Sequence, residues 1–257
     1  MARWRSRRRL AFFGTKATLT RDEQRLARRL LGVWRAGLRQ ALALLQADST
    51  TIPETFWDEL RAQQQAALAP WLEHLVQYGL ESGRVQVGMP VGAGKAVPEI
   101  GIQVDWNLVD QNALAWAQAY TYDLVGGITQ TTREKLQSAI GDWLRAGEAF
   151  PQLRERVEAI FDDPKRAELI AVTETTRAVA EGNTQAWQAA GVWGREWRTA
   201  RDELVCPVCG PLHRQRAMIG QAFPGNITNP PAHPNCRCVI VPVVEPERSP
   251  APGIDQE

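Results

Sequence analysis

The sequence predicts a mainly α-helical protein with a small α+β C-terminal module, and three observations support this fold class. Apolar residues recur at helical spacing through residues 20–80 and again through residues 105–191. Residues 81–104, between them, are rich in Gly and Pro and predict a linker or loop. All four cysteines follow residue 191, in a weakly periodic segment that ends in the strand-like run VIVPVV. We therefore expect two helical segments joined by a linker, followed by a module at residues 195–244 that cysteine and histidine side chains hold together.

The composition is that of an ordinary globular protein. The chain has 257 residues, of which 44% are hydrophobic and 23% are charged. No run approaches the ~18 uncharged apolar residues of a membrane span, so we expect none. The N-terminus is basic and then apolar only from Leu10 to Phe13, without a following small-residue cleavage site, so secretion is not expected.

The first helical segment has clear start signals. Thr20 to Glu23 forms a capping box, which predicts a helix that begins at Thr20. A second box, Thr51 to Glu54 with Pro53 at the first helical position, predicts the next helix. We expect Pro70 to kink or split that helix. Leu and Trp recur at helical spacing along each of these two helices. This pattern predicts that one face of each helix lies in the core or packs on a partner.

The second helical segment is predicted in several pieces. One helix runs from Asn107 to the Gly126-Gly127 pair, and the capping box from Thr131 to Glu134 opens another that stops at Gly147. Pro151 opens a short helix. Asp163-Pro164 begins a long one that ends at Gly191, and strands are predicted at residues 193–199 and 239–244.

The near-neutral net charge of +1 conceals an uneven distribution. Residues 1–40 contain 12 Arg or Lys and two acids, a net of +10, whereas residues 41–257 carry a net of −9. Such an arm attracts anionic partners through counterion release and steering, and double-stranded DNA, an anionic lipid surface and an acidic protein surface are candidates. A solvated basic terminus without a dedicated partner is the alternative. The predicted contact residues are the closely spaced arginines Arg3, Arg5, Arg7, Arg8 and Arg9. We expect residues 1–19 and the Pro-rich tail, residues 245–257, to be disordered.

The cysteines and one histidine have metal-ligand spacing. Cys206 and Cys209 are two thiols on one tight turn, and His233, Cys236 and Cys238 follow about 25 residues later. Five donors thus compete for the four places of a tetrahedral structural zinc site, with His213 a weaker sixth. Two disulfides or reduced structural thiols are an alternative, and a catalytic or redox cysteine pair is a second. Cytosolic thiols stay reduced, which disfavours disulfides, and five donors leave no obvious open position for a catalytic zinc.

Five other polar residues have simple expected roles. Glu174 and Arg177 are three residues apart on one helix and predict an intrahelical ion pair. Asp202 could hydrogen-bond the cysteine turn or orient His233. Arg237 could donate to thiolates or to an acidic partner. His74, on a helical stripe, is expected in the core or against a partner.

The order of several short motifs resembles one known family. These are Thr173-Glu174-Thr175-Thr176-Arg177, Gly191, Trp197-Arg198-Thr199, Asp202, Cys206-x-x-Cys209-x-x-Leu212 and Pro230-Pro231-x-His233-Pro234-Asn235-Cys236-Arg237-Cys238. The pattern resembles the C-terminal domain of the phage head morphogenesis family, the Mu F-like minor head proteins of tailed phages and prophages, over roughly residues 105–244.

The resemblance implies a non-enzymatic minor capsid protein. It implies association with the portal protein and other head proteins, a few copies inside the capsid, and a role in head assembly and DNA packaging or delivery, with the host cytoplasm as the site of assembly. No small-molecule substrate is implied. Some family members carry Arg and His in place of C-x-x-C, so metal is not a family requirement.

Two alternatives come from other classes of protein. A zinc-containing HNH-type DNA-processing enzyme has similar H-x-x-C and C-x-x-C pairs, but this chain has only three histidines, two of them in the Cys-rich segment. A plain zinc-ribbon DNA-binding module is the other, although residues 191–244 are not notably basic.

Overall fold

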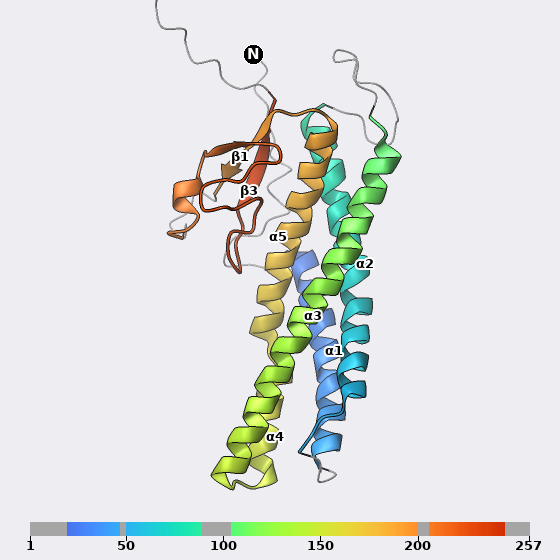
Figure 1. The fold of residues 1–257 in the computed structure, drawn as a ribbon, viewed down its shortest axis with the longest axis vertical. Coiled ribbons are helices and arrows are strands. Elements are labelled where there is room, and N and C mark those ends of the chain that lie inside the picture. Colours follow the sequence, from blue (N-terminus) through green and yellow to red (C-terminus); the bar gives the residue numbers. More distant parts are fainter. Residues whose placement is uncertain (1–19, 47–49, 89–103, 200–205, 245–257) are drawn as a thin grey trace, which may run out of the picture.

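The computed structural model describes residues 20–46, 50–88, 104–199 and 206–244. Within these ranges the chain forms an elongated bundle of five α-helices with a small three-stranded sheet beside one end of α5 (Figure 1). The elements are α1 (Arg21–Gln46), α2 (Glu54–Gln86), α3 (Trp106–Ala146), α4 (Phe150–Phe161), α5 (Pro164–Ala189), β1 (Gly194–Arg198), the short 3-10 helix η2 (Gly210–Leu212), β2 (Arg216–Met218) and β3 (Val239–Val243). The predicted fold class is confirmed.

The five helices share a hydrophobic core. Trp34 of α1, Leu60 of α2, Leu136 of α3 and Phe161 of α4 are all buried in one cluster, which also includes Ala171 of α5. Helices from both sides of residues 81–104 therefore bury their apolar faces against one another. The linker expected here therefore does not divide the helices into two separate cores, because neither set of helices closes its core alone.

Helices α2 and α5 touch backbone to backbone. A Cβ atom added at Gly182 would lie 2.1 Å from the carbonyl oxygen of Val76, and one at Gly79 would lie 2.4 Å from that of Val179. Only glycine permits this approach. The crossing fixes the end of α2 against the helix that carries the C-terminal module.

Three predictions for α2 need correction. Residues 81–86, predicted as linker, are the last turns of this helix, and Gly83 there packs on Ala186 and Asn183 of α5. Pro70 does not split the helix. Leu68 and Leu72 on either side of it are fully or almost fully buried, so tertiary packing holds a helix that local propensity would interrupt. Pro53 is the N-cap rather than the first helical residue.

Helix α3 is one helix of 41 residues, not the two that we predicted. The Gly126-Gly127 pair does not end it, and Thr131 does not cap a new one. The hydroxyls of Thr131 and Thr132 instead bond back to the carbonyl oxygens of Gly127 (2.9 Å) and Ile128 (2.8 Å). Burial of this stretch against the other helices outweighs its weak helix propensity.

The predicted caps of α1 and α5 are confirmed. The backbone N–H of Thr20 donates to Glu23 Oε2 (2.7 Å) while that of Glu23 donates to Thr20 Oγ1 (3.2 Å). The Asp163 carboxylate caps α5 by accepting from the N–H of Arg166 (2.9 Å). Gly147, in the left-handed region at φ 61°, ends α3 as predicted.

The sheet has the order β2-β1-β3, and both pairings are antiparallel. Its central strand β1 buries Trp197, whose ring packs edge-on against Phe223 at a centroid distance of 5.3 Å. Leu80 of α2 and Trp187 of α5 belong to the same hydrophobic cluster. The sheet therefore packs against the C-terminal parts of α2 and α5. No helix in the described ranges combines the length and apolar character needed to cross a membrane.

Candidate metal centre

The first half of the centre is the turn Cys206-Pro207-Val208-Cys209. The N–H of Cys209 donates to both the carbonyl oxygen (3.1 Å) and the sulfur (3.3 Å) of Cys206, and the N–H of Gly210 donates to the same carbonyl (2.9 Å). This geometry closes the turn and holds the two sulfurs on one side of it. Helix η2 then leads the chain away.

The second half is the turn His233-Pro234-Asn235-Cys236. The N–H of Cys236 donates to the carbonyl oxygen of His233 (3.2 Å), and Asn235 takes the left-handed conformation that Asn tolerates, at φ 61°. The His233 Nδ1–H donates to the carbonyl oxygen of Pro234 (2.7 Å). That bond leaves Nε2 with a free lone pair.

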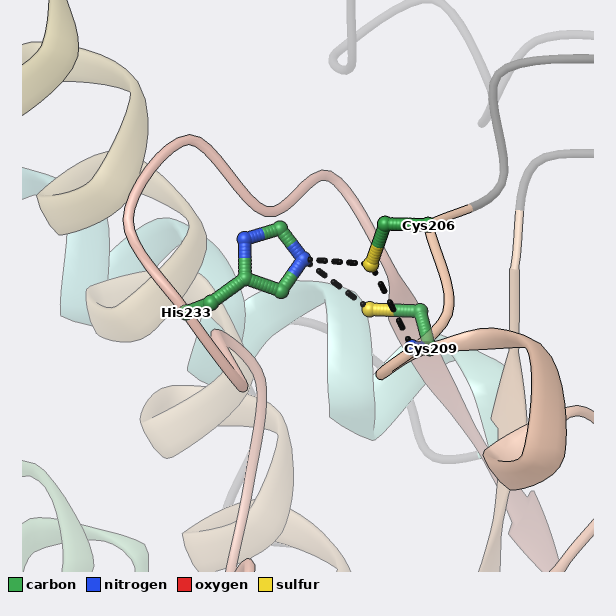
Figure 2. A group of neighbouring side chains, drawn as sticks. All are labelled: Cys206, Cys209 and His233. Carbon is green, nitrogen blue, oxygen red and sulfur yellow. Dashed lines mark hydrogen bonds between the residues drawn. The ribbon is translucent and has the colours of Figure 1, made fainter.

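The two turns face each other (Figure 2). His233 Nε2 lies 3.0 Å from Cys206 Sγ and 3.2 Å from Cys209 Sγ, and Cys209 Sγ lies 3.7 Å from Cys236 Sγ. The donors form two groups that share Cys209, one with Cys206 and His233 and the other with Cys236 and Cys238, and within each group the ligand atoms lie within 4.8 Å of one another. All five predicted ligands are thus brought together.

This donor set suits a thiophilic metal ion. Ligands of tetrahedral zinc, with Zn–S bonds of about 2.3 Å, lie about 3.8 Å apart, close to the Cys209–Cys236 separation of 3.7 Å. The four cysteines are free thiols rather than disulfides. Cys209, Cys236 and Cys238 are buried, and a buried cluster of thiols with an imidazole is the environment in which zinc or another soft ion binds. The residues present therefore fit zinc.

The buried thiols bind protons with very different affinities. A hydrogen bond from the Cys238 thiol lowers the pKa of Cys236 to about 5. Burial, followed by the nearby charge of Cys236, raises the pKa of Cys209 to about 12. The hydrogen bond to Cys236, together with burial, also raises the pKa of Cys238. A bound cation would favour ionisation of all the thiol ligands.

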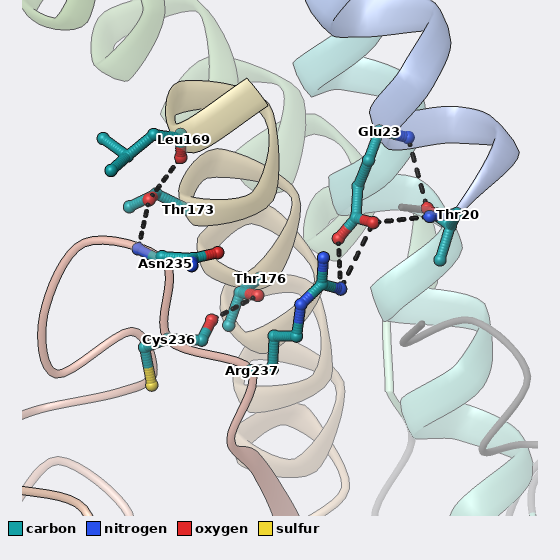
Figure 3. A network of polar contacts seen from close by, with 8 residues as sticks. All are labelled: Thr20, Glu23, Leu169, Thr173, Thr176, Asn235, Cys236 and Arg237. Atoms are coloured by element: carbon teal, nitrogen blue, oxygen red, sulfur yellow. Dashed lines mark hydrogen bonds and ion pairs between the residues drawn. The ribbon is translucent and has the colours of Figure 1, made fainter. Parts of the chain in front are cut away.

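The second turn is tied to two helices of the bundle (Figure 3). The N–H of Asn235 donates to Thr173 Oγ1 (2.9 Å), and Thr176 Oγ1 donates to the carbonyl oxygen of Cys236 (3.0 Å). Both threonines belong to α5. The Arg237 guanidinium donates to both carboxylate oxygens of Glu23 in α1, at 2.9 and 3.2 Å. The Glu23 side chain is 0% exposed and that of Arg237 is 5% exposed.

The other expectations for this region have mixed outcomes. His213 is not with the ligands, because its Nδ1 lies 2.9 Å from Thr199 Oγ1. Arg237 donates to an acid, which is one of its two expected roles, but this acid is Glu23 of its own chain rather than that of a partner. His74 is exposed beside the Trp71 ring, not in the core. Asp202 lies outside the described residues, as do Arg3, Arg5, Arg7, Arg8 and Arg9.

The predicted Glu174–Arg177 pair is confirmed at 3.1 Å. The sequence did not indicate that Glu174 is buried or that Tyr120 of α3 donates to it at 2.7 Å. Burial, and then the charge of Glu174, raises the pKa of Tyr120. The one available signal was the run of polar residues from Thr173 to Arg177 inside a long helix, because polar side chains in a buried stretch need partners.

The fold and the site define a class: a helical bundle that carries a small C-terminal module built around a Cys/His cluster. Residues 134–241, from within α3 to within β3, match the model of the family described as phage Mu protein F like protein, a phage head morphogenesis family. The resemblance expected from the sequence is thereby confirmed for this segment. No curated protein and no solved structure matches the chain significantly.

Proposed function

We propose that the protein is a minor capsid protein of a tailed phage or prophage, which acts at the portal vertex inside the head in capsid assembly and DNA packaging or delivery. The observation that carries this proposal is the family match over residues 134–241, which includes the Cys/His cluster and the strands around it. Its partners are the portal protein and other head proteins. Its location is the virion, and the host cytoplasm during assembly.

The proposed role of the metal centre is structural and not catalytic. A zinc ion at this site would link two turns about 25 residues apart, and the second of these turns is itself fastened to α5 and α1. The ion would therefore hold the module on the bundle. Structural zinc supplies folding free energy outright, of order 10 kcal/mol in small modules.

The basic N-terminal arm is the proposed contact with double-stranded DNA or with an acidic head protein. Support comes from the charge of residues 1–40 and from its continuation along α1, where Arg21, Arg28 and Arg39 are exposed. Arg25 and Arg35 are exposed as well, but pair with Asp22 and Asp162. Arginine side chains of this kind bind phosphates or carboxylates without reading sequence.

The test is co-expression of the full chain with the portal protein of the same phage or prophage. We expect the two to co-elute in size-exclusion chromatography, and we expect mass spectrometry of purified virions to find the chain at far fewer copies than the major capsid protein. The portal protein of an unrelated tailed phage is the matched control. Absence of the chain from virions, together with no complex with its own portal protein, would contradict the proposal.

The HNH-type alternative predicts divalent-metal-dependent nicking of plasmid DNA. The geometry gives it little support, because His233 faces the thiols, His213 contacts Thr199 and His74 lies beside Trp71. No pair of histidines therefore forms a ligand and a general base at one site. Nicking by the purified full chain that depends on added Mg²⁺ would favour this enzyme over the capsid protein.

A further inference from the structure

We propose that the metal ion takes one nitrogen and three sulfur ligands, from Cys206, Cys209, His233 and Cys236, and that Cys238 stays outside the shell as a thiol beside Cys236. This inference rests on the zinc centre of the proposed function and chooses among its five candidate donors. Three features of the structure carry it.

The two ligand turns share their residue positions and their closing hydrogen bond, although Asn235 is left-handed and its counterpart Val208 is not. In each turn the potential ligands are the first and fourth residues, proline is second, and the fourth N–H donates to the first carbonyl oxygen, at 3.1 Å from Cys209 to Cys206 and at 3.2 Å from Cys236 to His233. Such a turn brings its first and fourth side chains to the same side, and Cys206 and Cys209 already lie in one group with ligand atoms within 4.8 Å of one another. His233 and Cys236 fall in different groups that Cys209 joins, so a shared ion would draw their ligand atoms together. The two turns supply four ligands, and Cys238 belongs to neither turn.

The histidine is already oriented as a ligand. Its Nδ1–H is fixed by the carbonyl oxygen of Pro234, and Nε2 faces the sulfurs of Cys206 and Cys209 at 3.0 and 3.2 Å. A backbone carbonyl that accepts from the second ring nitrogen is a typical outer contact of a zinc-bound histidine, because it sets the tautomer and the ring plane. These three residues therefore make up three corners of the tetrahedron.

The fourth corner must lie next to Cys209, which is the donor shared by both groups. Cys236 Sγ lies 3.7 Å from Cys209 Sγ, close to the edge of about 3.8 Å expected for two thiolates on one zinc ion. Cys238 instead directly precedes β3, where Val239 pairs with Arg198 of β1. It shares the hydrophobic core of the module with Trp197 and Ile240. The sheet thus fixes the backbone at Cys238, whereas the turn carries Cys236.

The position of Cys238 suggests what its thiol does. It lies in the same buried group as Cys236, with its sulfur within 4.8 Å of that sulfur, and a thiol at this place can act as a hydrogen-bond donor. A donor to a metal-bound thiolate reduces the charge on sulfur and stabilises the complex without occupying a coordination position. We therefore class Cys238 as a positioning residue for Cys236.

The test uses cobalt(II) in the full-length protein, because its sulfur-to-metal charge-transfer absorption scales with the number of thiolate ligands. We expect one metal ion and three thiolates per chain in the wild type. Cys238→Ser should keep one ion and three thiolates, with metal affinity reduced by up to about 100-fold, the usual effect of changing an outer contact. Cys236→Ser should lower the count to two thiolates.

His233→Cys is the matched gain-of-ligand variant, and we expect it to retain one ion while the thiolate count rises to four. Circular dichroism of each variant confirms that the helices are intact. If Cys238→Ser loses a thiolate and Cys236→Ser does not, Cys238 is the fourth ligand and the proposal is wrong. A wild type with four thiolates also overturns it. A wild type that binds no metal removes the zinc centre as well, whereas the portal experiment would still stand.

Discussion

Removal of the buried charge at Glu23 should destabilise the whole protein. The Glu23 carboxylate accepts two bonds from Arg237 and one from the N–H of Thr20, and the two charged side chains are 0% and 5% exposed. Glu23→Gln keeps the shape and one acceptor but leaves the guanidinium buried without its counter-charge. Breaking one partner of a buried pair costs about 3–5 kcal/mol, so we expect the free energy of unfolding to fall by about 3 kcal/mol.

Urea unfolding followed by circular dichroism measures this loss. Asp142→Asn is the matched control, because it removes the charge of an exposed pair with Arg145, and such pairs contribute about 0–1 kcal/mol. The double variant Glu23→Gln/Arg237→Met should recover part of the loss, since it removes the stranded charge as well. A Glu23→Gln protein within about 0.5 kcal/mol of the wild type would refute the reasoning.

The remaining predictions concern the metal, the helix crossing and the arm. The purified protein should contain about one zinc per chain. Chelation of that zinc should increase amide hydrogen exchange in residues 206–244 more than in α3. Protein that lacks zinc when prepared under reducing conditions would contradict this prediction. Gly182→Ala should lower the free energy of unfolding by about 1–3 kcal/mol, because the added methyl group would clash with the backbone of Val76. The control Gly126→Ala places its methyl group in open space, so it should be neutral or should stabilise the protein by up to about 1 kcal/mol. Deletion of residues 1–19 should abolish salt-sensitive DNA binding without a change in melting temperature. If five arginines contact phosphates, log K against log salt should have a slope of about −4.5 in the intact chain, and a slope unaltered by the deletion would assign no role to the arm.

Local signals in the sequence predicted much of the fold. The capping residues Thr20 and Asp163 and the αL glycine Gly147 act within a few residues of themselves, and each does what the sequence indicated. The breaks predicted at Pro70 and Gly126 failed for the opposite reason. There, packing against helices distant in sequence outweighs local propensity, and a local pattern cannot report that packing.

The candidate site also combines features that the local sequence predicts with features that it does not. The five donors were predictable because ligand spacing is a local property of two short turns. The attachment of the second turn was not predictable. Glu23 and Arg237 are 214 residues apart. Each already had a local role that explained its presence, Glu23 as a capping residue and Arg237 as a neighbour of the cysteines. The fold joins them without any signal from residues nearby in sequence.

The helix crossing at Gly182 also determines what the family segment can do alone. The match begins at residue 134, inside α3, and includes neither α1 nor α2. Yet α2 covers Ala178 and Val179 of α5 with Leu72 and Leu75, and α1 supplies the acid for Arg237. The family signature therefore marks part of a fold and not an autonomous unit. Replacement of residues 134–241 by the corresponding segment of a protein from the matched family would yield a folded hybrid only if the facing surfaces of α1 and α2 were exchanged with it.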